Sequence, residues 1–247
     1  MSFPDTSAER RALERFWVMK ASFTGRPYYT FTLSRRFHEW PEAGDKEFVR
    51  RVFEESHELD LVPDRPLPIR VGRGGRRADL HSFLATMELA GQRLLELLMA
   101  FSAGSIRPHP VVVYDRKDRE GLDIELWWLR IAPRGGPADR TRGLFLLQQA
   151  GWWHRDLELR DGHGLYFDVD PWDGSDVFVL PNYGVPIVTE RVASAIRTAG
   201  LKNVILTPVL DYGRGTRDYA VAAMKRRLER EGRLPEAPAA SPGGARR

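Results

Sequence analysis

The sequence predicts an α+β protein, organised as a single domain with a mixed or antiparallel sheet and a few packed helices. Residues 176–212 carry the clearest pattern, a complete strand–turn–helix–turn–strand unit. A weaker copy of its helix–Gly–strand part lies upstream, and no linker divides the body of the chain. We therefore expect one domain over residues 1–233, followed by a tail over 234–247.

The N-terminal part predicts short elements joined by turns. A charged helix is expected over 8–15. Strands are expected over 17–33 around a turn at Thr24-Gly25-Arg26-Pro27, with Tyr28, Phe31 and Leu33 as apolar β formers. Residues 45–55 show the pattern of a short amphipathic helix. The stretch 63–77 is rich in Pro, Gly and Arg, which is typical of a connection rather than of an element.

The first strong helix is expected over 89–101, and a β run follows it. The apolar residues of this helix recur at helical spacing: Leu94, Leu97, Leu98 and Phe101. Gly104 then leads into the β run at 110–115. Residues 122–131 begin as an alternating strand and become apolar on both faces, as in a strand passing from the edge to the centre of a sheet.

The stretch before the C-terminal unit is less regular. Residues 133–141 form a Gly/Pro-rich loop pattern, and 144–153 fits either a helix or a strand. A hairpin is expected over 157–169 and a short strand over 177–180.

The C-terminal unit signals both ends of its helix. Thr189 is a good N-cap, and Glu190 places negative charge in the first turn. Arg197 occupies the last turn, and Gly200 offers a left-handed stop before a second β run at 208–212. The apolar residues between them again have helical spacing: Val192, Ala195, Ile196 and Ala199. A terminal helix is expected over 219–231, and the low-complexity tail is expected to be disordered.

Composition bounds the function. The 247 residues are 42% hydrophobic and 29% charged, which is ordinary for a soluble globular protein. The sequence contains no apolar run of about 18 residues, so no membrane span is expected. The N-terminus lacks the apolar core of a secretory signal. Cys is absent, which excludes disulfides and thiolate chemistry. We expect a cytoplasmic protein with no membrane partner.

The net charge of +4 invites a nucleic-acid interpretation. Only five of the 38 basic residues are Lys, and such a bias towards Arg often follows codon composition. Most of the Arg residues are scattered and have acids close by, although 70–77 and 225–233 are denser clusters. A charge run is usually a solvated face, so we expect no nucleic-acid partner.

The residues with reactive or metal-binding side chains form no recognisable catalytic or cofactor motif. The acidic string at 168–176 resembles a calcium loop, but its third acid falls one position late, Pro171 intrudes and Val179 occupies the twelfth position. A turn with Asx hydrogen bonds is the simpler interpretation. None of the six His residues shows the i, i+4 spacing of a helical metal pair: His38, His57, His81, His109, His154 and His163. We expect no catalytic residue, cofactor or metal, and no enzyme.

The aromatic residues offer a better indication of function. Five of the seven Trp are Trp127, Trp128, Trp152, Trp153 and Trp172. Adjacent residues of a strand point to opposite faces, so one Trp of each pair is either core or an exposed anchor for a partner. Within the acidic string we select the partner-binding set Asp168, Asp170, Trp172, Asp173 and Asp176.

The C-terminal unit resembles the bacterial immunity proteins of polymorphic toxin systems, family eleven. The resemblance covers about 16–212 and is loose in its N-terminal half. It is carried by Asp176-Val177-Phe178, Ile187-Val188-Thr189-Glu190, Ala199-Gly200, Leu201-Lys202-Asn203-Val204 and Pro208-Val209. Asn203 stands where Gly is more usual, a mild change because Asn also adopts left-handed geometry. The Trp-rich strand also lacks the Asp-ending motif expected at its end, where Ala132-Pro133-Arg134 stands.

The resemblance implies a non-catalytic protein that binds and neutralises a cognate toxin, for example a nuclease, in the cytoplasm of the producing cell. Such a protein needs a rigid scaffold and one complementary surface. The alternative is an α+β enzyme or small-ligand binder whose site is assembled only in three dimensions.

Overall fold

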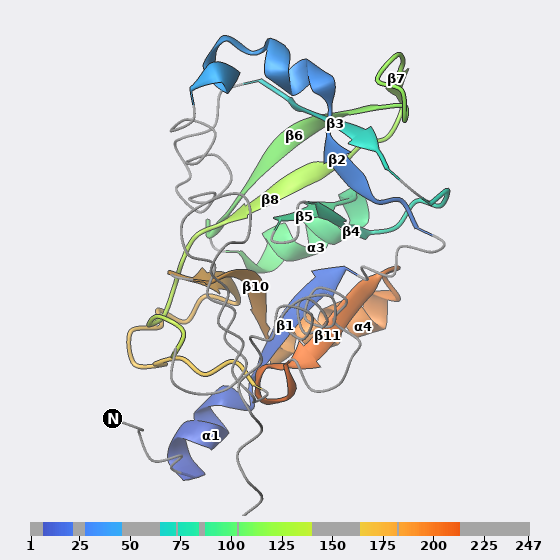
Figure 1. The fold of residues 1–247 in the computed structure, drawn as a ribbon. Helices are drawn as coiled ribbons and strands as arrows, with labels where there is room; N and C mark the ends of the chain where they lie inside the picture. Colours follow the sequence, from blue (N-terminus) through green and yellow to red (C-terminus); the bar gives the residue numbers. More distant parts are fainter. Residues whose placement is uncertain are drawn as a thin grey trace, which may run out of the picture.

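The computed structural model describes residues 7–21, 28–45, 65–72, 74–83, 87–102, 104–139, 164–181 and 183–212. It confirms the α+β class, with strands arranged in two sheets rather than in one (Figure 1). The expectations for 219–231 and 234–247, and nearly all of those for 45–55, 144–153 and 157–163, fall outside the described residues. No helix among the described residues is long and apolar enough to cross a membrane.

The first sheet has four antiparallel strands. Their order across the sheet is β11 (Val204–Pro208), β1 (Phe16–Ala21), β10 (Tyr183–Thr189) and β9 (Val177–Leu180). The free edge of β9 is continued by residues 132–134, because the N–H of Arg134 donates to the carbonyl of Val179 at 2.9 Å. The chain that leaves the second sheet therefore closes one edge of the first.

The second sheet closes on itself. Its order is β3 (Leu67–Val71), β2 (Phe31–Leu33), β4 (Leu80–Phe83), β5 (Met87–Ala90), β8 (Trp127–Ile131), β6 (Ile106–Tyr114) and β7 (Gly121–Leu122). An additional parallel pairing of β3 with β6 joins the ends of a ring of six strands, with β7 as an extension. We call this the closed sheet. A closed sheet has no exposed edge to manage and encloses its own apolar core.

Buried side chains fill the closed sheet. They include Phe31, Leu67, Ile69, Phe83, Leu89, Val113 and Trp128. Trp127, the neighbour of Trp128, packs instead on the core outside the ring. The core interpretation therefore holds for Trp128, whereas Trp127 is only partly buried on the other face of β8.

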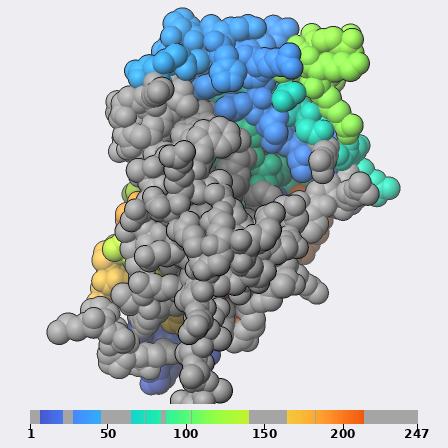
Figure 2. All heavy atoms as spheres, viewed as in Figure 1, coloured from blue at the N-terminus to red at the C-terminus, as the bar shows by residue number. Residues whose placement is uncertain are grey.

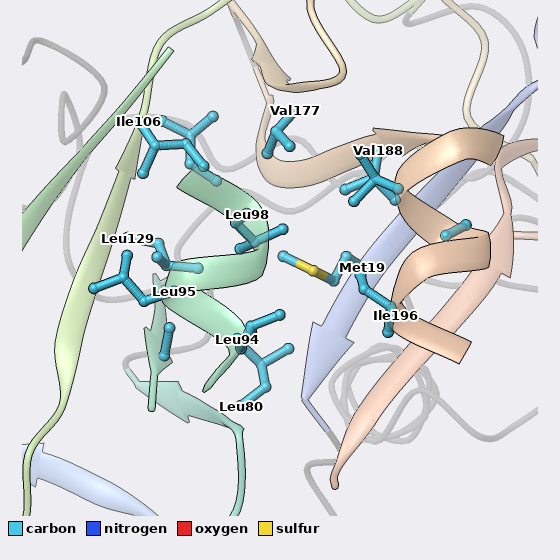
Figure 3. Close-up of a cluster of buried hydrophobic side chains, with 14 of the residues drawn as sticks. Met19, Leu80, Leu94, Leu95, Leu98, Ile106, Leu129, Val177, Val188 and Ile196 are labelled. Carbon is cyan, nitrogen blue, oxygen red and sulfur yellow. The ribbon is translucent and has the colours of Figure 1, made fainter. Parts of the chain in front are cut away.

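Two helices and both sheets share a further core. The helix α3 (Gln92–Phe101) and the helix α4 (Glu190–Ala199) contribute Leu94, Leu98, Val192 and Ile196, and these meet Met19 of β1 and Leu129 of β8 (Figure 3). The other helical pieces among the described residues are α1 (Ser7–Leu13) and the 3-10 turns Arg35–Glu39, Pro41–Gly44 and Val209–Asp211.

The repeated helix–Gly–strand unit is confirmed. Gly104 has φ 85° between α3 and β6, and Gly200 has φ 59° at the end of α4. Asn203 also adopts a left-handed conformation, at φ 64°. The second unit differs from the prediction in its strand, since β11 covers 204–208 and a 3-10 turn occupies most of 208–212.

The predicted connection at 63–77 is wrong over part of its length, because it contains the strand β3. Leu67, Ile69 and Val71 alternate towards the interior of the closed sheet, while β2 and β6 pair on either side. Pairing on both edges stabilises a strand whose composition, with Pro68 and Arg70, is poor for β structure.

Other boundaries also shift. The strands of 17–33 exist, but β1 and β2 belong to different sheets and do not pair with each other, and the turn expected at 24–27 lies outside the described residues. The helix expected over 89–101 begins at Gln92, because Leu89 and Ala90 pair with β8. Within 122–131, residues 123–126 leave the ladder and only the part from Trp127 is a central strand.

His81 is a buried polar residue that links two segments of the closed sheet by hydrogen bonds. Its Nε2 accepts from the N–H of Ala78 at 3.2 Å, so Nδ1 carries the proton and donates to the carbonyl of Tyr29 at 3.0 Å. Burial lowers the pKa of His81, although the bond to Tyr29 and the charge of Asp79 act in the opposite direction. The fold therefore holds this imidazole in its neutral form.

This arrangement predicts an acid-sensitive contribution to stability. Because the folded pKa lies below the unfolded value of about 6.5, the contribution is complete above that pH and is lost as the pH falls. Urea unfolding of the wild type and of His81→Gln between pH 7.5 and 5.5 measures it. The wild type should lose more stability than the variant, by at most about 1.4 kcal/mol for each pH unit below 6.5. Parallel pH profiles of the two proteins would contradict the prediction.

Candidate functional site

The acidic turn, residues 168–176, packs its Trp172 on the face of the four-stranded sheet opposite α4. Phe167 precedes it and pairs with Ala138 in an isolated bridge, and β9 follows it. Phe167 and Phe178 are buried in one apolar cluster, with ring centroids 6.1 Å apart. Core residues on both sides thus anchor the turn.

Carboxylates of the turn bond to the backbone that follows them. Oδ1 of Asp168 accepts from the N–H of Asp170, and Oδ1 of Asp173 accepts from the N–H of Ser175, each at 3.0 Å. These are the Asx hydrogen bonds that the sequence predicted. Gly174, at φ 89°, provides the left-handed residue that the second of them encloses.

Trp172 folds back onto the protein. Its ring packs edge-on against Phe16 at 5.1 Å between centroids, and its Nε1 donates to the carbonyl of Ser175 at 2.9 Å. The guanidinium carbon of Arg15 lies 4.6 Å from the ring centroid, within the range of a cation–π contact. The ring is half-buried, so it holds the turn on the sheet in addition to any contact with a partner.

Asp173 is paired within the chain. Nε of Arg134 lies 2.7 Å from its Oδ2. Partial burial acts to raise the pKa of Asp173, but hydrogen bonds from Ser175 and the charge of Arg134 outweigh it and hold this pKa below its ordinary value. Arg134 thus neutralises part of the negative charge of the turn.

Asp176 is buried at the end of the turn, with 8% of its surface exposed. Its Oδ1 accepts from the hydroxyl of Thr189 at 2.5 Å, and its carboxylate pairs with Arg191. Thr189 stands at the N-cap position of α4 as predicted, but its side chain makes no capping bond because its hydroxyl donates to Asp176 instead. We therefore assign Asp176 a positioning role and drop it from the set of residues proposed to contact a partner.

Asp168 and Asp170 remain as the accessible charges of the turn. Both side chains are exposed. Within the described part of the chain, neither carboxylate forms an ion pair. The predicted set of four carboxylates and a Trp therefore reduces to two outward-facing carboxylates beside a half-buried ring.

The described residues contain no group of three or more His, Asp or Glu side chains arranged to hold a metal ion. Of the six His residues, three are described. His38 is exposed on a 3-10 turn, His81 is buried in the closed sheet and bonded to the backbone of Tyr29, and His109 lies on β6 beside Trp128.

A shallow groove of about 320 Å³ lies where residues 123–126 leave the ladder beside β6. Its lining is Pro110, Val111, Val112, Val113, Leu122, Asp123, Ile124, Glu125, Leu126 and Trp127. Most of this wall is apolar, and the two acids, Asp123 and Glu125, are exposed. Asp123 and Glu125 are the ionisable side chains of this lining, which includes no His, Ser, Lys or Tyr.

Sequence reasoning did not find the residues that shape the acidic turn from outside it. Arg15 is the last residue of the helix predicted at 8–15, and Arg191 lies two residues after the N-cap Thr189. Arg134 stands in the loop after β8. Local patterns carry no signal for contacts between segments so far apart, because each Arg looks like an ordinary surface charge.

A scan against protein-family models and a search of curated proteins each give no match to this chain.

Proposed function

We propose that this protein is an immunity protein, which binds a cognate toxin and neutralises it without chemistry. The observation that carries the proposal is the acidic turn, which presents Asp168 and Asp170 on a frame held by Asx bonds, Trp172 and Arg134. Such preorganisation suits recognition, because little conformational freedom is lost when the partner binds. A basic surface of the toxin, such as the substrate-binding face of a nuclease, is the complementary partner.

The resemblance supports the same proposal. Its motif residues fall on one continuous unit, β9, β10, α4 and β11, which forms three strands of the four-stranded sheet and the helix packed on it. The acidic turn leads directly into this unit at Asp176. A toxin-binding surface here would rest on the most regular part of the fold.

The experiment is a charge change on the turn that keeps its geometry. Asp168→Asn retains the acceptor of the Asx bond, and Asp170→Lys reverses an exposed charge. The double variant should bind the toxin encoded by the neighbouring gene with an association rate at least about tenfold slower at low salt, because rim charges act mainly on the encounter. Stopped-flow kinetics at two salt concentrations measure this, and high salt should remove the difference.

The matched control is Asp123→Asn with Glu125→Lys, which makes the same change of charge on the groove. It should protect cells and associate as the wild type does. Equal protection and equal rates for the turn variant would reject the turn as the interface. Turnover of a substrate by the purified protein, with no binding to the neighbouring toxin, would reject the immunity function itself.

The groove is the feature that favours the alternative, a small-ligand binder. Its apolar wall would take an apolar group, and Asp123 and Glu125 would favour a positive charge beside it. Carboxylates also serve as general acids and bases, so the same lining fits either form of the alternative, a ligand binder or an enzyme.

A further inference from the structure

Arginine-bearing segments from distant parts of the sequence meet at the end of the closed sheet where β6 turns into β7. Asp118, at φ 60° in this turn, is the centre of the junction. Its Oδ2 accepts from the N–H of Arg35 at 3.0 Å and lies 3.7 Å from Nε of Arg70. The Asp118 side chain is 6% exposed, so this carboxylate offsets the cations from beneath rather than from the surface.

Further bonds hold the same segments together. Arg70 donates to the carbonyl of Arg116 at 3.3 Å, and Arg116 donates to the carbonyl of Gly74 at 3.0 Å. Gly74, at φ 87°, approaches Tyr28 so closely that an added Cβ would lie 1.9 Å from its carbonyl oxygen. The guanidinium carbon of Arg36 lies 4.7 Å from the ring centroid of Tyr114. The junction is therefore built from fixed main-chain and side-chain contacts.

The turn itself is also fixed. The N–H of Arg119 donates to Oδ1 of Asp115 at 2.7 Å, and the N–H of Lys117 donates to the same oxygen at 3.1 Å. These bonds lower the pKa of Asp115, and the bond from Arg119 has the larger effect. Partial desolvation of the Asp115 carboxylate acts in the opposite direction. The Asp115 carboxylate thus bonds within its own turn and stabilises it.

This junction concentrates positive charge at the surface. The exposed cations of the basic rim, as we call it, are Arg35, Arg76, Arg77, Arg116, Lys117 and Arg119. Among the described residues of the same segments, the exposed acids are Glu39, Asp45, Glu120 and Asp123, fewer than the exposed cations. Figure 2 shows the segments side by side at one end of the molecule, with residues 28–45 in blue, those near 70–77 in teal and the β6–β7 turn in green.

The chemistry of the rim distinguishes between two kinds of anionic partner. Protein interfaces are centred on apolar or aromatic anchors, but the large apolar side chains exposed in the described part of the chain are Met99, Val112 and Ile205, none of them a rim residue. Phosphate backbones need only cations on a firm frame, and the Arg fork matches their oxygens. We propose that the basic rim binds the phosphate backbone of a nucleic acid, without sequence specificity. This proposal is independent of the toxin-binding function.

The sequence argued against such a partner because its Arg residues are scattered along the chain. The fold changes that assessment, since it brings Arg35, the 70–77 cluster and the β6–β7 turn together. The rim also lies on the closed sheet, whereas the acidic turn lies on the four-stranded sheet. The two surfaces have opposite charge and separate supports.

The test is the binding of labelled nucleic acid to the full chain, followed by fluorescence anisotropy. A mixed-sequence duplex DNA and a single-stranded RNA, each of about 20 nucleotides per strand, serve as probes. The wild type should bind with Kd of about 10⁻⁴–10⁻⁶ M near physiological salt, and log K should fall linearly with log of the salt concentration. The variant Arg35→Gln/Arg76→Gln/Lys117→Gln removes three rim side chains for which the described part of the chain gives no ion pair. It should lower the slope by about 2–3 and weaken binding at least about tenfold at low salt.

The matched control removes three exposed cations elsewhere, in Arg10→Gln/Arg11→Gln/Lys202→Gln. It should keep the wild-type slope and bind within about threefold of the wild type. Equal losses in both triple variants would overturn the proposal, because binding would then follow net charge and not the rim. Absence of wild-type binding to either probe at low salt would also overturn it. So would rim-dependent binding of an acidic protein with no binding of nucleic acid.

Discussion

Leu98→Ala should lower the free energy of unfolding by about 2–5 kcal/mol. Leu98 is fully buried on α3, in the core where both sheets and α4 meet (Figure 3). Deleting its branched end removes contacts with more than one layer at once, and a cavity between two sheets collapses poorly because each sheet is held by its own hydrogen bonds. Urea unfolding at neutral pH measures the change.

The adjacent residue supplies the control. Met99 is 42% exposed on the same helix, and Met99→Ala should change stability by less than about 0.5 kcal/mol. A small effect at both positions would mean that α3 is not a structural bridge between the sheets. A large effect at Met99 as well would indicate that its exposed side is covered in solution.

Trp172→Ala should lower stability by about 3 kcal/mol, near the lower end of the range for aromatic truncation because the ring is only half-buried. The variant loses the edge-on contact with Phe16, the contact with Arg15 and the bond to Ser175. Thermal or urea unfolding of the free protein measures this effect without any partner. Retention of full stability would contradict the packing seen here.

Trp172→Phe separates the structural role from binding. Phe keeps a ring against Phe16 but cannot donate to Ser175, so stability should recover in large part. We predict that Trp172 also contributes to toxin binding, as the anchor of the acidic turn. Weakened binding in the folded Trp172→Phe variant supports that role, whereas wild-type affinity in this variant limits Trp172 to holding the turn.

Local patterns predicted the helix of the C-terminal unit well. In α4 the charge of Glu190, the left-handed Gly200 and the stripe around Val192 and Ile196 all act within one turn of their neighbours. Such short-range effects can be read along the chain. The same reason explains why the Asx bonds of Asp168 and Asp173 were predicted correctly.

Patterns failed where a segment depends on what pairs with it. The strand β3 has Pro68 and Arg70 among its five residues, and it forms because β2 and β6 lie on either side. The separation of β1 and β2 into different sheets is likewise decided by the strands that pair with them. Local sequence gives each segment as a strand but does not say which strand it pairs with. Strand propensity is context-dependent, so composition could not decide these cases.

The sequence by itself determined the α+β class, the helix–Gly–strand repeat and the acidic string, because each rests on neighbours in the chain. Only the tertiary structure decided which acids of the string face outward. Asp176 bonds to Thr189 and pairs with Arg191, and Asp173 pairs with Arg134. Asp168 and Asp170 stay exposed. The same holds for the basic rim, which exists only because closing the sheet brings distant arginines to one end. A surface charge is defined by its neighbours in space, and these are set by packing rather than by position along the chain.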